Sequence, residues 1–207
     1  MKQFKMTKNA CLDRDVLGLY HAEWYGARDE RSPRFVYSLK NDFLDRTPWQ
    51  LNSAKQQLRD VLLKDFGRIS QVVKRPLTVC VVPRAKKEKA YQANQLLFKT
   101  VVGECAANTI GFVDGTAFII RTVNTFTTHL SRPMEGHIND GSRPYRGIAI
   151  DSCEFSSEIS GRDILLVDDV YTKSSNIDED MVQALFDQGA RSVIFYAVGY
   201  TVFRNQR

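Results

Sequence analysis

The sequence predicts an α/β protein built around a parallel β-sheet, as in Rossmann-like folds, and two observations lead to this fold class. Residues 77–82 and 164–167 are short, unbroken runs of apolar and mostly branched side chains, which is typical of strands buried on both faces of a sheet. Each run is followed by a polar loop and then by a segment of helical character. Strands that alternate with helices predict parallel pairing through right-handed crossovers.

The segment that precedes these units is aromatic-rich and has no long helical period. We therefore expect an N-terminal extension or hood at residues 1–50 and a main domain at residues 51–207. Within the extension, residues 16–25 and 34–39 are predicted to be strands. Its aromatic side chains are expected to pack the extension onto the main domain, with a base-stacking surface as the alternative.

The remaining elements are predicted in order along the chain. A helix is expected at residues 52–66, because its apolar residues form one stripe, and Gly67 is expected to end it. The other expected elements are a helix at 90–107, a strand at 117–120, a helix from Ile177 that Gly189 closes, and a last strand at 192–198.

Composition limits the class of protein. The four cysteines are widely scattered and form no C-x-x-C pair, which argues against a zinc ribbon or a disulfide framework and predicts a cytoplasmic location. No run approaches the ~20 apolar residues of a membrane span, so no membrane association is expected. The net charge of +5 permits nucleic acid as a partner without requiring it, and a homodimer is also compatible with the sequence.

Two adjacent carboxylates, Asp168 and Asp169, follow the apolar run 164–167. Small and polar residues come next, and then the helix from Ile177. In open α/β sheets ligands bind outside the carboxyl ends of the strands, and a turn that leads into a helix favours a phosphate. A solvated strand end is the simpler interpretation of an acidic pair. The agreement of strand, turn and helix instead favours a binding site for sugar hydroxyls or a divalent cation beside a phosphate.

This stretch resembles the ribose-phosphate motif of type I phosphoribosyltransferases, an apolar run followed by Asp-Asp, an apolar residue, any residue, Thr-Thr-Gly, any residue and Thr. Four residues match it: Asp168, Asp169, Val170 and Thr172. Lys173, Ser174 and Asn176 depart from it, where the family has Thr, Gly and Thr. The resemblance implies a phosphoribosyltransferase fold that binds phosphoribosyl pyrophosphate (PRPP), with the acids on the ribose hydroxyls and the loop on the 5-phosphate. The ribose-phosphate site would comprise Asp168, Asp169, Val170, Tyr171, Thr172, Lys173, Ser174, Ser175 and Asn176.

The loop after residues 77–82 is strongly basic and resembles the ComF (competence-protein) branch of that family. The resemblance lies in Pro83, the basic residues after it, and Asn94-Gln95 at the start of the next helix. It implies a pyrophosphate site formed by Pro83, Arg84, Ala85 and Lys86. A charge run is more often a solvated surface, but a cationic loop opposite an anionic one suits a ligand that carries ribose and pyrophosphate. Residues 1–50 contain only Cys11, so we do not expect them to form the N-terminal zinc ribbon that the branch often carries.

Residues 121–147 form a long polar stretch that contains Arg121, Arg132, Arg143 and Arg146. A loop of this length is usually a lid, a binding loop or a disordered segment. The resemblance implies a mobile loop that closes over the pyrophosphate through one of these arginines, followed by an apolar strand at residues 147–150.

The resemblance implies transfer of the phosphoribosyl group from Mg²⁺–PRPP to a nitrogen acceptor, with release of pyrophosphate. Asp168, Asp169, Arg84 and Lys86 would be the catalytic residues, and Mg²⁺ would contact Asp168 and Asp169 directly or indirectly. A catalytically weak or inactive regulatory protein that binds PRPP or a nucleotide is the alternative, as is a DNA-processing accessory. The departures at Lys173, Ser174 and Asn176, together with acidic residues 178–180, predict a weak phosphate site and little turnover.

Overall fold

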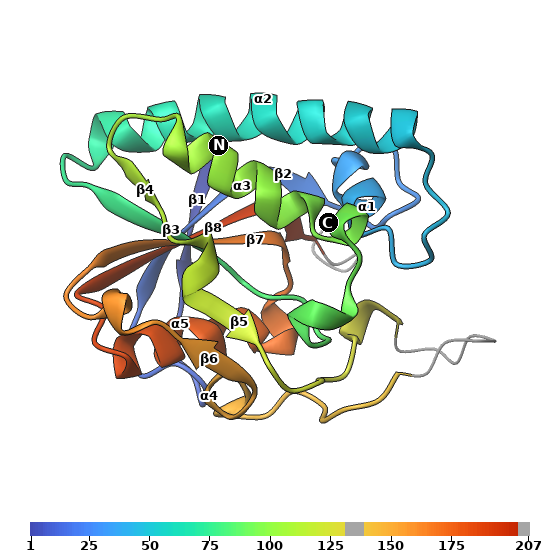
Figure 1. Ribbon diagram of the computed structural model, residues 1–207. Coiled ribbons are helices and arrows are strands. Elements are labelled where there is room, and N and C mark those ends of the chain that lie inside the picture. The colour runs from blue at the N-terminus through green and yellow to red at the C-terminus, as the bar shows by residue number, and fades with distance from the viewer. Residues whose placement is uncertain (131–138, 203–207) are drawn as a thin grey trace.

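In residues 1–130 and 139–202, which the computed structural model describes, the chain forms a six-stranded sheet with the order β1-β2-β8-β7-β3-β4 (Figure 1). The parallel strands are β2 (Val16–Trp24), β8 (Ser192–Thr201), β7 (Asp163–Tyr171), β3 (Leu77–Val81) and β4 (Phe112–Asp114). The edge strand β1 (Lys2–Met6) pairs with β2 in the antiparallel direction. This mostly parallel sheet confirms the α/β class and is compatible with a Rossmann-like fold.

Strand β7 lies in the interior of the sheet, between β3 and β8. Leu165 is opposite both Val79 and Ile194, so β7 is hydrogen-bonded along both edges. Its side chains alternate between the two faces, as a strand requires: Leu165 and Val167 join one core and Ile164 and Leu166 the other. All four are fully buried, as the apolar run predicted.

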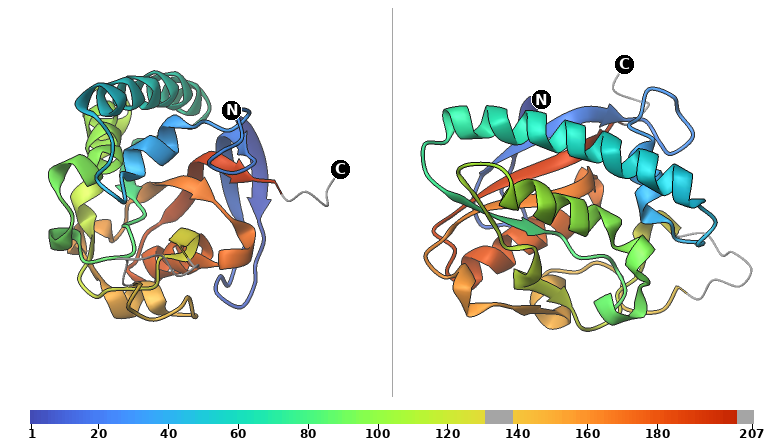
Figure 2. Two further views of the ribbon diagram at one scale, coloured as in Figure 1. Left: turned by 90° about the vertical axis from the view of Figure 1, so that its right-hand side faces the viewer. Right: turned by 45° about the horizontal axis from the view of Figure 1, so that its top comes forward.

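Helices cover both faces of the sheet (Figures 1 and 2). One face carries α1 (Phe35–Lys40), α2 (Pro48–Val72) and α3 (Leu97–Ala107), and the other carries α4 (Ile148–Ser152) and α5 (Ile177–Asp187). Beside α4, strands β5 (Ile119–Arg121) and β6 (Cys153–Phe155) form a small antiparallel sheet. No helix within the described ranges has the length and apolar character that would be needed to cross a membrane.

Helix α2 is longer than predicted at both ends. Thr47 is its N-cap and forms a capping box with Gln50, and Pro48 occupies the first turn, where its missing N–H costs nothing. Gly67 lies inside the helix and does not end it. The helix continues because Phe66 and Ile69 still pack into the core beyond the predicted end.

Three predicted strands are wrong or misplaced. Residues 34–39 mostly form helix α1, in which Val36 and Leu39 are buried at helical spacing. Residues 147–150 begin helix α4, and Gly147 adopts the left-handed φ of 93° at its start. Strand β5 starts at Ile119 and pairs with β6, outside the central sheet. The helix expected from residue 90 begins only at Leu97, after two short 3₁₀ turns.

The N-terminal segment contributes directly to the central sheet. Strand β2 confirms the prediction for residues 16–25 and pairs with β8 from Gly18 to Trp24. Phe4 of β1 packs against Tyr171 and Tyr200, with ring centroids 4.8 and 5.0 Å away. The segment predicted as an extension therefore supplies two strands and, through α1, a wall of the cavity described below.

Candidate functional site

A cavity of about 1030 Å³ opens at the carboxyl ends of β3 and β7. From the predicted site residues, its lining includes Pro83, Arg84, Ala85, Lys86, Asp168, Asp169, Val170, Thr172, Ser174, Ser175 and Asn176. The structure thus brings the acidic pair and the basic loop, which are more than 80 residues apart in sequence, to one site. Of the predicted residues, Tyr171 and Lys173 do not line this cavity: Tyr171 is buried in the core and Lys173 is exposed.

The acidic pair lies within β7, which continues to Tyr171, and not after its end. The Oδ1 atom of Asp168 accepts the backbone N–H of Asp169 at 2.7 Å. Burial and repulsion from Asp169 raise the pKa of Asp168 to about 7, although Lys40 opposes the shift. The two carboxylates therefore have different environments despite being neighbours in sequence.

A further carboxylate, that of Asp178 in the first turn of α5, lies beside Asp168 in the lining of the cavity. Asp178 is 2% exposed, and its side chain is hydrogen-bonded to that of Asp168. Burial and the charge of Asp168 raise the pKa of Asp178 well above its usual value. Because a carboxylate can donate a hydrogen bond only when it is protonated, the pair of Asp168 and Asp178 shares one proton.

The carboxylate of Asp169 is paired with a residue that no sequence motif marks. Lys40, the last residue of α1, places its Nζ atom 2.5 Å from Asp169 Oδ2, and the two side chains are 20% and 19% exposed. Burial alone lowers the pKa of Lys40, but the charge and hydrogen bond of Asp169, with Asp168 and Asp42, raise it overall. Lys40 therefore stays protonated at neutral pH and neutralises Asp169.

Arg84, predicted to contact pyrophosphate, is hydrogen-bonded to the turn that follows α1. Its Nη1 atom donates to the carbonyl oxygens of Lys40 at 2.6 Å and Gln95 at 2.7 Å, and its Nη2 atom pairs with Asp42. The guanidinium also stacks on Tyr91, 4.3 Å from the ring centroid. These contacts fix the turn with Lys40 against the basic loop.

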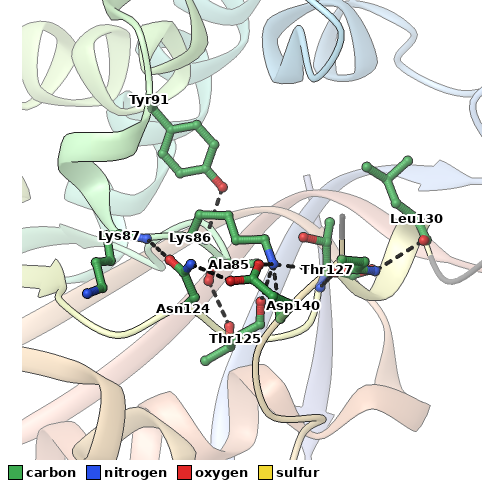
Figure 3. Close-up of polar contacts among 10 residues, drawn as sticks. Ala85, Lys86, Lys87, Tyr91, Asn124, Thr125, Thr127, Leu130 and Asp140 are labelled. Atoms are coloured by element: carbon green, nitrogen blue, oxygen red, sulfur yellow. Dashed lines mark hydrogen bonds and ion pairs between the residues drawn. The ribbon is translucent and has the colours of Figure 1, made fainter. Parts of the chain in front are cut away.

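Lys86 is tied to the described ends of the predicted lid (Figure 3). Its Nζ atom donates to the carbonyl oxygen of Thr125 at 3.0 Å and pairs with Asp140 Oδ1 at 2.7 Å. Asn124 donates to the other oxygen of Asp140 at 2.8 Å, and Thr125 N–H donates to Ala85 O at 2.7 Å. The segments on both sides of residues 131–138 therefore meet at the basic loop.

The four arginines of the predicted lid have different positions. Arg132 lies outside the described residues. Arg121 is 5% exposed and donates to Ser152 and to the carbonyl oxygen of Arg84, so it supports the wall of the cavity. Arg143 is exposed, lines the cavity and stacks over Phe126 at 4.4 Å, whereas Arg146 is exposed outside the lining. Among the described lid arginines, Arg143 is the best placed to meet a ligand.

The loop after β7 turns sharply at Asn176, which has the left-handed φ of 53° and precedes α5. Ser174, which stands where the phosphoribosyltransferase motif that this stretch resembles has Gly, does not have a positive φ. Asn is one of the few residues that adopt the left-handed conformation readily. The Oδ1 atom of Asn176 also accepts from Asn9 Nδ2 at 3.1 Å, so the N-terminal segment supports this turn. The departure at Ser174 therefore does not by itself disrupt the loop.

The acidic first turn of α5 places less charge at the cavity than expected. Glu179 accepts from Tyr171 OH at 2.7 Å within the core. Asp180 accepts the N–H groups of Gly147 at 2.5 Å and Ala149 at 2.8 Å, and so caps the start of α4. Of these three acids only Asp178 lines the cavity, where it is hydrogen-bonded to Asp168 and its pKa is raised by burial and by the charge of Asp168.

Within the described ranges, no cluster of three or more His, Cys, Asp and Glu side chains is arranged to hold a metal ion. No family model matches this chain, and no curated protein matches its sequence. The geometry of the cavity and the residues that line it are therefore the basis for assigning a function.

Proposed function

We propose that this chain has a phosphoribosyltransferase-type fold and binds PRPP or a related ribose phosphate in the cavity. One observation carries the proposal: the carboxylates of β7 and the basic loop after the adjacent strand β3 line the same cavity. A ligand with a diol at one end and a diphosphate at the other matches this separation of charge. A simple sugar would contact only the carboxylates, and a simple phosphate would contact only the basic loop.

Each part of the ligand has a counterpart in the lining. Asp168 and Asp169 would accept hydrogen bonds from the ribose hydroxyls. The 5-phosphate would lie at the turn with Ser174, Ser175 and Asn176, where the N–H groups at the start of α5 point outward as at any helix N-terminus.

The diphosphate would lie along the basic loop, with Arg143 from the lid on its other side. Arg84 and Lys86 supply positive potential there even while they hold Asp42 and Asp140. Their full charge is available only if a ligand displaces those carboxylates.

The carboxylates do not suit direct coordination of Mg²⁺. Asp169 is neutralised by Lys40 at 2.5 Å, and Asp168 is hydrogen-bonded to Asp178, so a cation at either carboxylate would compete with the partner that the carboxylate already has. Mg²⁺ therefore enters this proposal only as a counter-ion that the diphosphate of the ligand carries.

As an enzyme, the protein would catalyse attack of a nitrogen acceptor on C1 of the ribose. The new C–N bond forms as the C–O bond to pyrophosphate breaks, and the acceptor loses its proton to solvent. Asp168 and Asp169 would orient the ribose, while Arg84 and Lys86 would stabilise the charge that accumulates on the leaving group.

A binding protein with weak or no transferase activity is the second candidate. One observation favours it: Arg84 and Lys86 are each paired with a carboxylate. Because these cations are already neutralised, they would stabilise the negative charge on a leaving group less strongly. Such a protein would sense PRPP or a nucleotide, or assist DNA processing. Pyrophosphate release across a panel of bases separates it from an enzyme, and a steep salt dependence of DNA binding would identify the accessory role.

The acidic pair provides the test of ligand binding. Asp168→Asn and Asp169→Asn should each weaken PRPP binding by roughly 1–3 kcal/mol, the cost of a lost charged hydrogen bond. Isothermal titration calorimetry measures this, with Asp187→Asn on the exposed end of α5 as the control for loss of one charge. Unchanged affinity in both variants of the pair would refute the assignment.

A further inference from the structure

Lys40 lies between the acidic pair and the basic loop. Its ammonium contacts Asp169, and its backbone is held by Arg84 from the basic loop. In a bound ribose diphosphate, a cation at this point would face both the diol and the nearest phosphate oxygens. In a site without this ammonium, a divalent cation would supply that positive charge.

On the basis of the proposed function, we propose that the Lys40 ammonium takes the electrostatic role of a divalent cation, so that the cavity binds its ribose diphosphate without requiring Mg²⁺. An ammonium has three N–H donors and no acceptor. One donor can keep Asp169, and the others are available to oxygens of the ligand. Lys40 is thus a residue that binds ligand, and its backbone is held in place by the hydrogen bond from Arg84.

The turn that carries Lys40 is rigidly built. Arg84 Nη1 donates to the Lys40 carbonyl oxygen at 2.6 Å, and Gln95 Nε2 donates to the next carbonyl, that of Asn41, at 3.2 Å. Asn41 is 2% exposed and adopts the left-handed φ of 42° that ends α1. Asp42, the following residue, pairs with Arg84 and lies 2.9 Å from His129 Nε2. Lys40 therefore meets the acidic pair from a fixed backbone, at little cost in ordering.

The charges around the acidic pair support the same assignment. Lys40 pairs with Asp169, and Asp178 is hydrogen-bonded to Asp168, so both acids already have a side-chain partner. A Mg²⁺ ion that bound the pair would also be repelled by the Lys40 ammonium. The same ammonium attracts a phosphate.

The experiment compares PRPP affinity in Mg²⁺ and in excess chelator, by calorimetry, for the unmodified protein and for Lys40→Gln. The unmodified protein should bind with similar affinity in both buffers. Lys40→Gln should lose about tenfold or more in chelator, the effect of one lost charged contact, and recover most of that loss when Mg²⁺ is added.

Lys99→Gln is the matched control, because Lys99 lines the same cavity, is 19% exposed and is paired to Glu88 at 2.6 Å. It should show no such dependence on Mg²⁺. Lys40→Arg keeps the charge and should stay close to the unmodified protein. Thermal unfolding with Mg²⁺ alone gives a second measurement: Mg²⁺ should raise the melting temperature of Lys40→Gln, in which Asp169 is released, more than that of the unmodified protein.

Three results would overturn the inference alone: an unmodified protein that binds PRPP only with Mg²⁺, an equal loss for Lys40→Gln in both buffers, or the same pattern in Lys99→Gln. If the unmodified protein binds neither PRPP nor ribose 5-phosphate in either buffer, the proposed function falls and the inference with it. If Lys40→Gln does not unfold cooperatively, the inference is tested by the PRPP affinities of Lys40→Arg and of the unmodified protein in the two buffers.

Discussion

Asp163, at the start of β7, is a single residue that stabilises the central strand through several polar contacts. Its carboxylate pairs with Arg191 and Arg75 and accepts from Ser192 Oγ at 2.6 Å, which ties β7 to the start of β8. The hydrogen bond from Arg191, aided by Ser192 and Arg75, lowers the pKa of Asp163 from 3.8 to about 2. Since the native state binds this proton less readily than the unfolded chain, Asp163 stabilises the fold above pH 3.8, and that contribution is lost as the pH falls toward 2.

Replacement of Asp163 by Asn should therefore reduce stability in a pH-dependent way. At neutral pH the free energy of unfolding should fall by about 1–2 kcal/mol, at the low end for a charged contact because both arginines are largely exposed. The difference from the unmodified protein should shrink as the pH approaches the folded pKa. Urea unfolding at several pH values measures it, and a difference that stays constant across the acid range would contradict this account.

The residues of the site were predictable to different degrees. Asp168, Asp169, Arg84 and Lys86 follow apolar runs that predict strands, and the carboxyl ends of parallel strands meet at one edge of a sheet, so the sequence predicted that these residues lie near one another. Lys40 was missed because its role depends on where α1 packs, and nothing in the local sequence specifies that. The partners of Arg84 and Lys86 were missed for the same reason, since Asp42 and Asp140 are 42 and 54 residues distant in the chain.

At the scale of elements, the loop between β7 and α5 depends on Asn176. The family motif places Thr at this position, but a β-branched residue at φ 53° is strained by about 1–2 kcal/mol. Asn176→Thr should therefore destabilise the protein and weaken ribose-phosphate binding, whereas Asn176→Gly should preserve the turn. Thermal unfolding and calorimetry test this, with Lys173→Thr on the exposed part of the loop as the control. Tighter binding in Asn176→Thr would show instead that the loop is a degenerate phosphate cradle.

The elements that the sequence predicted well are those with a clear hydrophobic pattern. Strands β3, β7 and β8 are apolar runs buried by neighbours on both sides, and α5 has one apolar stripe followed by Gly189, which adopts the left-handed φ of 85°. Helix α1 and strands β4 to β6 are at most six residues long, which is too short for a period to appear. Their conformation is decided by tertiary packing, as Val36 and Leu39 show.

At the scale of the molecule, the cavity is assembled from segments far apart in the chain. Strands β3 and β7 contribute the two loops, the N-terminal segment contributes Trp24, Tyr37 and Lys40, and the region after β5 contributes Arg143. The sequence indicated one site because the two strands were both recognisable. It did not indicate that the N-terminal segment joins the same sheet, since pairing between β2 and β8 joins residues more than 170 positions apart.

The most direct test of the central claim is calorimetric titration of the unmodified protein with PRPP in the presence of Mg²⁺, alongside ribose 5-phosphate, inorganic pyrophosphate and a nucleoside monophosphate. PRPP should bind most tightly, by about tenfold or more over ribose 5-phosphate, because it alone among these ligands would contact the acidic pair, the loop before α5 and the basic loop together. Absence of PRPP binding, or equal affinity for PRPP and pyrophosphate, would contradict the account.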